Sequence, residues 1–98
     1  MLPKRIQMKR TKGWRKPANT VYVGRPTKWG NPFRIGPDMD AQTSVVRYRE
    51  WLSGKRHLDI DPPTNAEIRA ELRGKNLACW CKVGEPCHCD VLLRIANS

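Results

Sequence analysis

Four cysteines and a histidine lie within eleven residues near the C-terminus, at Cys79, Cys81, Cys87, His88 and Cys89. Thiols and imidazoles are the ligands that zinc prefers in a four-coordinate protein site. The spacing differs from paired C-x2-C knuckles, because the pairs here are C-x-C and adjacent residues cannot all reach one ion easily. The cluster indicates a metal site, and zinc is the ion we expect there.

A reactive thiol is the second interpretation of this cluster. A cysteine at a helix N-terminus has a lowered pKa, and a neighbouring histidine can act as acid or base. If the protein is an enzyme, the candidate catalytic residues are therefore Cys87, His88 and Asp90, or a metal-activated water. The simplest interpretation makes Cys79 a small buried residue of a strand and lets His88 pack against the last helix.

The chain carries no apolar run near the roughly 20 residues that span a membrane, and its first residues lack the apolar stretch of a secretory signal. We therefore expect a cytoplasmic protein with no membrane partner. In a reducing cytosol, closely spaced cysteines are typical of metal ligands or reactive thiols rather than disulfides.

The net charge of +10 is concentrated in the first third of the chain. Residues 1–37 hold ten Lys/Arg and no Asp/Glu, whereas residues 38–98 hold nine of each. Residues 1–19 form a basic N-terminal arm that should attract nucleic acid or phosphorylated ligands, although solubility or a disordered leader would explain it equally well. We expect removal of residues 1–16 to weaken nucleic-acid binding and to leave the core folded.

The segment Arg25–Phe33 contains two prolines, a glycine and an asparagine, and this composition predicts a loop. In a binding site, Arg25 and Lys28 would hold phosphate, Asn31 would hydrogen-bond a base edge and Trp29 would stack on a base. The alternative is a rigid structural loop in which Trp29 belongs to the core.

The elements that position these residues follow from hydrophobic periodicity and capping signals. Residues 20–24 and 76–81 predict strands, the first of them central in a sheet. Helices are expected over residues 41–52, after a cap at Asp38 or Asp40, over a short run from Thr64 to Gly74, and over residues 89–96. This order predicts one α/β domain over residues 20–98, with a short, parallel sheet flanked by helices.

Two stretches, RPTKWGNPF (residues 25–33) and LACWCKVGEPCHCDVLL (residues 77–93), resemble a phage and bacterial family that is catalogued as a domain of unknown function. The resemblance covers about residues 21–97. Its CWC and PCH-small-Asp pattern maps onto Cys79, Trp80, Cys81, Pro86, Cys87, His88 and Asp90. The resemblance implies the ligand set Cys79, Cys81, Cys87 and His88, with Cys89 at a variable position as a spare thiol.

The Cys-His-x-Asp ending is also similar to the Cys-His-Arg ending of another uncharacterised bacterial family, whose fold is Rossmann-like. In such sheets the ligand crevice lies at the carboxyl ends of the strands, so the loop after Val23 would lie beside the loop after Cys81. We prefer a metal-stabilised domain that binds a nucleotide or nucleic acid. An enzyme acting on such a substrate and a phage-type module that binds a protein partner are the alternatives.

Overall fold

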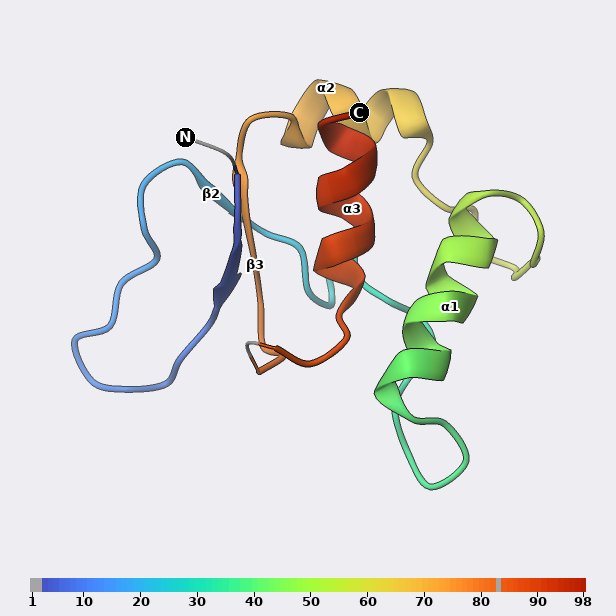
Figure 1. Cartoon of the computed structure of the whole chain (residues 1–98), viewed down its shortest axis with the longest axis horizontal. Helices are drawn as coiled ribbons and strands as arrows, with labels where there is room; N and C mark the ends of the chain where they lie inside the picture. The colour runs from blue at the N-terminus through green and yellow to red at the C-terminus, as the bar shows by residue number, and fades with distance from the viewer. Residues whose placement is uncertain (1–2, 83) are drawn as a thin grey trace.

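Three short strands form a parallel sheet in which the last strand of the chain is central. The computed structural model describes residues 3–82 and 84–98. Its elements are β1 (Arg5–Gln7), β2 (Thr20–Tyr22), α1 (Ala41–Leu52), α2 (Asn65–Leu72), β3 (Asn76–Cys79) and α3 (His88–Ala96), shown in Figure 1. The prediction of a small α/β domain with a short parallel sheet is confirmed. Its likeness to a Rossmann fragment stays a prediction.

The strand order is β1-β3-β2, so the prediction that residues 20–24 form a central strand is wrong. β3 takes the centre because Leu77, Ala78 and Cys79 are all buried, as a strand flanked on both sides requires. β2 is an edge strand, and its residues are only partly buried. This arrangement carries Cys79 to the carboxyl end of the central strand.

The basic arm contributes β1, which the sequence analysis did not predict. Ile6 lies opposite Ala78, and the flanking backbone bonds join Leu77 N to Lys4 O at 3.0 Å and Met8 N to Cys79 O at 2.7 Å. Arg5–Gln7 is therefore part of the sheet. Because β1 covers one whole side of β3, the structure does not support the expectation that the core tolerates the loss of residues 1–16.

The helices begin where their caps predict. The Asp40 side chain accepts a hydrogen bond from Thr43 N and starts α1, and the predicted capping box of Thr64 and Glu67 starts α2. The Thr64 backbone N–H holds the pKa of Glu67 below its usual value. α3 begins at His88, one residue before the predicted start.

The core lies between the sheet and the helices, and α3 lies between the sheet and α1 (Figure 1). Its largest buried side chains include Tyr48 of α1, Leu72 of α2 and Leu92 of α3, with Leu77 of β3. The Tyr48 hydroxyl donates to Trp29 O at 2.7 Å and so fixes the 25–33 loop on α1. Over residues 3–82 and 84–98, no helix has the length and apolar character needed to cross a membrane.

Candidate metal centre and adjoining cleft

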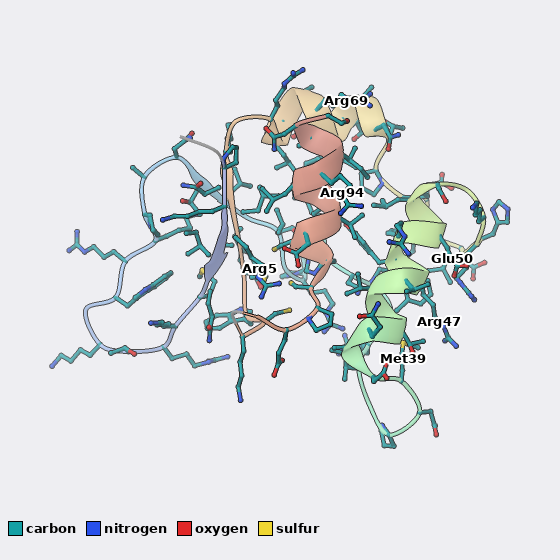
Figure 2. All side chains as sticks on the ribbon, in the orientation of Figure 1. Arg5, Met39, Arg47, Glu50, Arg69 and Arg94 are labelled. Carbon is teal, nitrogen blue, oxygen red and sulfur yellow. The ribbon has the colours of Figure 1, made fainter. Side chains whose placement is uncertain are left out.

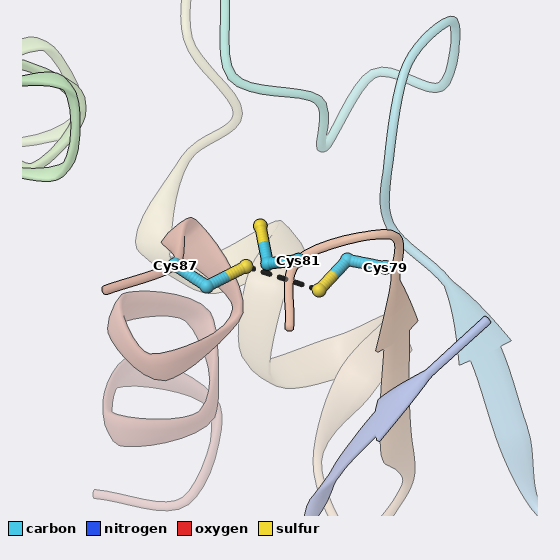
Figure 3. A group of neighbouring side chains, drawn as sticks. All are labelled: Cys79, Cys81 and Cys87. Atoms are coloured by element: carbon cyan, nitrogen blue, oxygen red, sulfur yellow. Dashed lines mark hydrogen bonds between the residues drawn. The ribbon is translucent and has the colours of Figure 1, made fainter. Parts of the chain in front are cut away.

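Three thiols converge where β3 ends and α3 begins. Cys79 is the last residue of β3, Cys81 follows two residues later, and Cys87 is the N-cap residue of α3. Their Sγ atoms all lie within 4.8 Å of one another, and Cys79 Sγ and Cys87 Sγ are 3.0 Å apart (Figure 3). Cys87 makes no side-chain cap bond, and all three are free thiols. The group could hold a metal ion.

The ionisation of these thiols depends on their contacts. Hydrogen bonds from Cys81 and Cys87 lower the pKa of Cys79, so that one thiol of the group ionises readily. The pKa of Cys87 is raised, first by the hydrogen bond of its thiol with Cys79, then by those with Cys81 and Cys89, and then by burial. Several thiolates this close repel one another unless a cation lies among them. A bound metal ion supplies that cation, because metal binding deprotonates its thiol ligands.

His88 is oriented as metal-binding histidines usually are. Its Nε2 atom lies 2.8 Å from Val23 O, and because a carbonyl only accepts, Nε2 carries the proton. Burial lowers the pKa of His88 and favours the neutral ring. The Nδ1 lone pair then faces the Cys87 thiol and accepts from Cys87 Sγ at 3.7 Å. A ring N–H donated to a backbone carbonyl is the common second interaction of a metal-bound histidine.

Cys89 is the other side chain that adjoins the three thiols. It is fully buried, and its thiol interacts with those of Cys79 and Cys87. The hydrogen bond to Cys79 raises the pKa of Cys89. His88 and Cys89 each contact a thiol of the group, and they are the two candidates for a fourth ligand. The ligand set Cys79, Cys81, Cys87 and His88 stays a prediction, and Cys89 is the alternative fourth ligand.

Arg5 of β1 holds the loop between the cysteine pairs (Figure 2). Its Nη1 donates to Glu85 O at 2.8 Å and to Asp90 Oδ2 at 2.9 Å, and its Nη2 donates to Lys82 O at 2.8 Å. The Arg5 side chain is only 11% exposed. Asp90, a predicted catalytic candidate, thus pairs with an arginine, while its catalytic role stays a prediction. Sequence reasoning missed Arg5 because β1 was not predicted.

Substitution of Arg5 by lysine should weaken metal binding by up to about 10- to 100-fold, because Arg5 holds the loop that joins Cys81 to Cys87 and outer contacts of a metal site have effects of this size. Lysine keeps the charge but cannot bond three oxygens in the fixed directions of a guanidinium. Competition with a chromophoric chelator measures the change. Arg15→Lys, the same substitution elsewhere in the arm, is the control, and equal zinc affinity in both variants would contradict a role for Arg5.

A cleft of about 420 Å³ opens beside the cysteine group. Its wall includes residues of both sequence motifs: Arg25, Asn31, Trp80, Cys81 and His88. The loop after β2 and the loop after β3 meet here because the two strands are parallel neighbours and end at the same edge of the sheet. The structure therefore brings the two motifs together in one site.

Two of the four predicted ligand-binding residues line this cleft, Arg25 and Asn31. The Asn31 amide is already engaged, since it donates to Ser44 Oγ at 2.8 Å and accepts from Phe33 N at 2.8 Å. Arg34, which sequence reasoning did not assign to the site, also lines the cleft. Its position follows from the fold of the loop and has no signal in the sequence.

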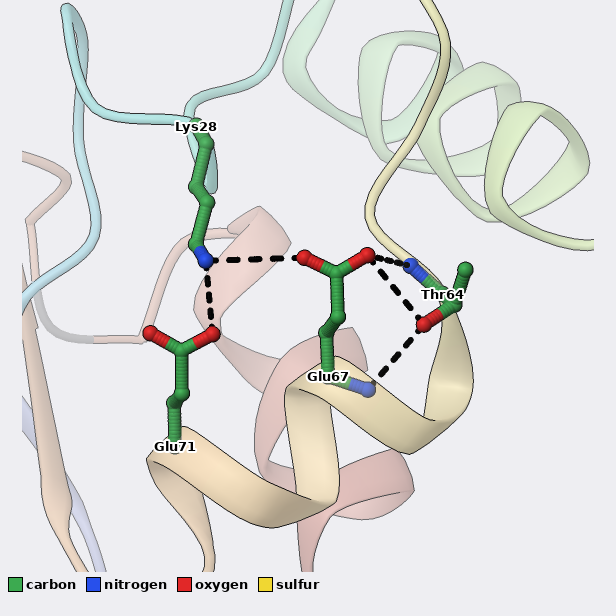
Figure 4. Close-up of polar contacts among 4 residues, drawn as sticks. All are labelled: Lys28, Thr64, Glu67 and Glu71. Carbon is green, nitrogen blue, oxygen red and sulfur yellow. Dashed lines mark hydrogen bonds and ion pairs between the residues drawn. The ribbon is translucent and has the colours of Figure 1, made fainter.

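The other two predicted residues, Lys28 and Trp29, lie elsewhere. Lys28 Nζ pairs with Glu71 at 2.6 Å and Glu67 at 3.5 Å on α2, and the bond to Glu71 raises the pKa of Lys28 (Figure 4). Trp29 is 5% exposed and belongs to the core. A base cannot stack on a ring that is buried. The burial of Trp29 therefore favours the alternative of a rigid structural loop in which Trp29 belongs to the core.

The chain was compared with family sequences, with curated proteins and with solved structures. No curated protein and no solved structure matches it significantly. The family described as "Domain of unknown function (DUF4326)" matches residues 6–98, which is nearly the whole of the structure from the second residue of β1 onward. On that match, the chain belongs to the DUF4326 family, in agreement with the family resemblance of its sequence.

Proposed function

We propose that the protein is a small zinc-stabilised domain that binds a nucleotide or nucleic acid in the cleft beside the cysteine group. One observation carries the proposal: thiols suited to a metal and arginines suited to phosphate line the same cleft. Sulfur and nitrogen ligands favour zinc over the hard cations, which prefer oxygen. The expectation of a cytoplasmic protein agrees with reduced thiols.

The charge of the cleft supports an anionic ligand. Arg25 and Arg34 line it, and among the described residues of its wall none is acidic. A guanidinium can bind two oxygens of one phosphate, which gives orientation as well as affinity. The arm adds further cations near the cleft, since Arg10 lies against Trp80 of its wall. A polyanion could therefore contact the cleft and the arm at once.

The test is binding of a fluorescent single-stranded oligonucleotide and of a nucleoside monophosphate at several salt concentrations. Arg25→Gln combined with Arg34→Gln should lower affinity at least about tenfold and reduce the slope of log affinity against log salt by up to roughly 2. Arg69→Gln, on the exposed face of α2 (Figure 2), is the control. Absence of binding by the unaltered protein, or equal binding by the double variant, would refute the proposal.

One observation supports the enzyme alternative: the Cys81 thiol is partly exposed and lies in the wall of the cleft. Cys87, the predicted nucleophile, is 2% exposed, and its raised pKa disfavours a thiolate in the metal-free protein. A catalytic zinc would need an open coordination position facing the cleft. A substrate in the cleft would reach this open position beside Cys81, because Cys81 is the partly exposed metal-ligand candidate in the cleft wall.

A further inference from the structure

Trp80 is the exposed tryptophan of the cleft. It is 44% exposed, whereas Trp29 and Trp51 are 5% and 3% exposed. Trp80 immediately follows β3 and lies between Cys79 and Cys81 in the sequence. Its backbone is therefore held by the end of the strand and by the two neighbouring cysteines of the thiol group. A large, partly exposed aromatic side chain in the wall of a cleft that also carries Arg25 and Arg34 is a candidate binding surface.

Hydrogen bonds hold the edge of the Trp80 ring and involve neither of its faces. Trp80 Nε1 donates to Tyr22 Oη at 3.1 Å, and the Tyr22 hydroxyl donates to Arg25 O at 2.9 Å. Gly24 permits this arrangement, because a Cβ there would collide with the Tyr22 ring. The indole is therefore oriented before any ligand binds, with its polar N–H already satisfied.

A cation from the basic arm lies on one face of this ring. The Arg10 guanidinium carbon is 4.8 Å from the Trp80 ring centroid, a distance typical of a cation–π interaction. The side chains of the segment between β1 and β2 extend away from the sheet (Figure 2). This segment carries five cations; they are Lys9, Arg10, Lys12, Arg15 and Lys16.

We propose that Trp80 is the platform on which an unpaired base of a single-stranded nucleic acid stacks, while the arm and Arg25 hold the adjoining phosphates. This inference rests on the proposed function and names its ligand class and stacking residue. Aromatic rings flanked by cations bind single strands in this way, because every base presents a π-face. A duplex hides those faces, and a mononucleotide reaches too few of the cations in the arm to use them.

The experiment compares the unaltered protein with Trp80→Leu and Trp80→Phe, using a labelled twelve-nucleotide oligo(dT), the matching duplex and thymidine monophosphate. Trp80→Leu should weaken oligo(dT) binding roughly 5- to 150-fold, the range for loss of one base–aromatic stack, without changing the salt slope. Trp80→Phe should retain most of the affinity. Oligo(dT) should also quench the tryptophan fluorescence of the unaltered protein and fail to quench that of Trp80→Phe.

The outcomes separate this inference from the proposed function. Equal oligo(dT) affinity in Trp80→Leu and the unaltered protein, or equal quenching in Trp80→Phe, would overturn the stacking role and leave the proposed function standing. Duplex or thymidine monophosphate bound as tightly as oligo(dT) would overturn the single-strand assignment. No binding of any probe would overturn both. If Trp80→Leu fails to fold, the fluorescence comparison with Trp80→Phe decides the question alone.

Discussion

Substitution of Cys87 by serine is expected to abolish metal binding and the cooperative thermal transition together. Cys87 Sγ lies 3.0 Å from Cys79 Sγ and 3.7 Å from His88 Nδ1. Structural zinc contributes about 10–16 kcal/mol to the folding of small zinc domains, whereas a core of this size contributes little by itself. Elemental analysis and circular dichroism melting of one preparation measure both effects.

Two further variants serve as matched comparisons for Cys87→Ser. His88→Gln and Cys89→Ala each remove one of the two candidates for the fourth ligand. The variant that lacks the true fourth ligand should lose metal nearly as completely as Cys87→Ser. The other variant should keep its metal. Retention of both metal and melting temperature in Cys87→Ser would show that the group is not a metal site.

Deletion of residues 1–16 is expected to destabilise the fold, in contrast to what the charge pattern alone predicts. The deletion removes β1, the Lys4 and Met8 backbone bonds to β3, and the three hydrogen bonds of Arg5. At about 1 kcal/mol for each hydrogen bond, the free energy of unfolding should fall by roughly 3–5 kcal/mol. That fall corresponds to a melting temperature lowered by at least about 12 °C.

A charge-only variant separates the two roles of the arm. Replacing the five cations of the arm that follow β1 with glutamine keeps the strand and Arg5; the positions are Lys9, Arg10, Lys12, Arg15 and Lys16. This variant should melt within a few degrees of the unaltered protein and bind nucleic acid more weakly, with a flatter salt dependence. An unchanged melting temperature in the deletion would contradict the structural role, and unchanged binding in the charge variant would contradict the polyanion role.

The elements with strong local signals were predicted from the sequence, and those set by tertiary contacts were not. α1 and α2 have side-chain caps at Asp40 and Thr64, and such signals depend on only a few neighbouring residues. β1 has three residues, too few to show an alternating pattern, and it forms only because β3 offers an unpaired side. The central place of β3 likewise depends on its two partners.

In the candidate site, too, the features with a local sequence signal were predicted and those set by tertiary contacts were not. The spacing of the cysteines was enough to predict a common cluster, because a strand end and a helix start lie close in the sequence. The burial of the tryptophans could not be predicted, since sequence gives residue type but not burial: Trp29 is in the core and Trp80 is exposed. Arg5 is 85 residues from its partner Asp90, and no local pattern relates two such distant residues.

The most direct test of the central claim is the metal content of protein purified without chelators, measured together with thiol titration before and after unfolding. The account predicts about one zinc per chain and thiols that react only after unfolding, because the cysteines are ligands as well as largely buried. No metal, together with a fast-reacting thiol in the folded protein, would contradict it and would make the enzyme alternative the better explanation of the site.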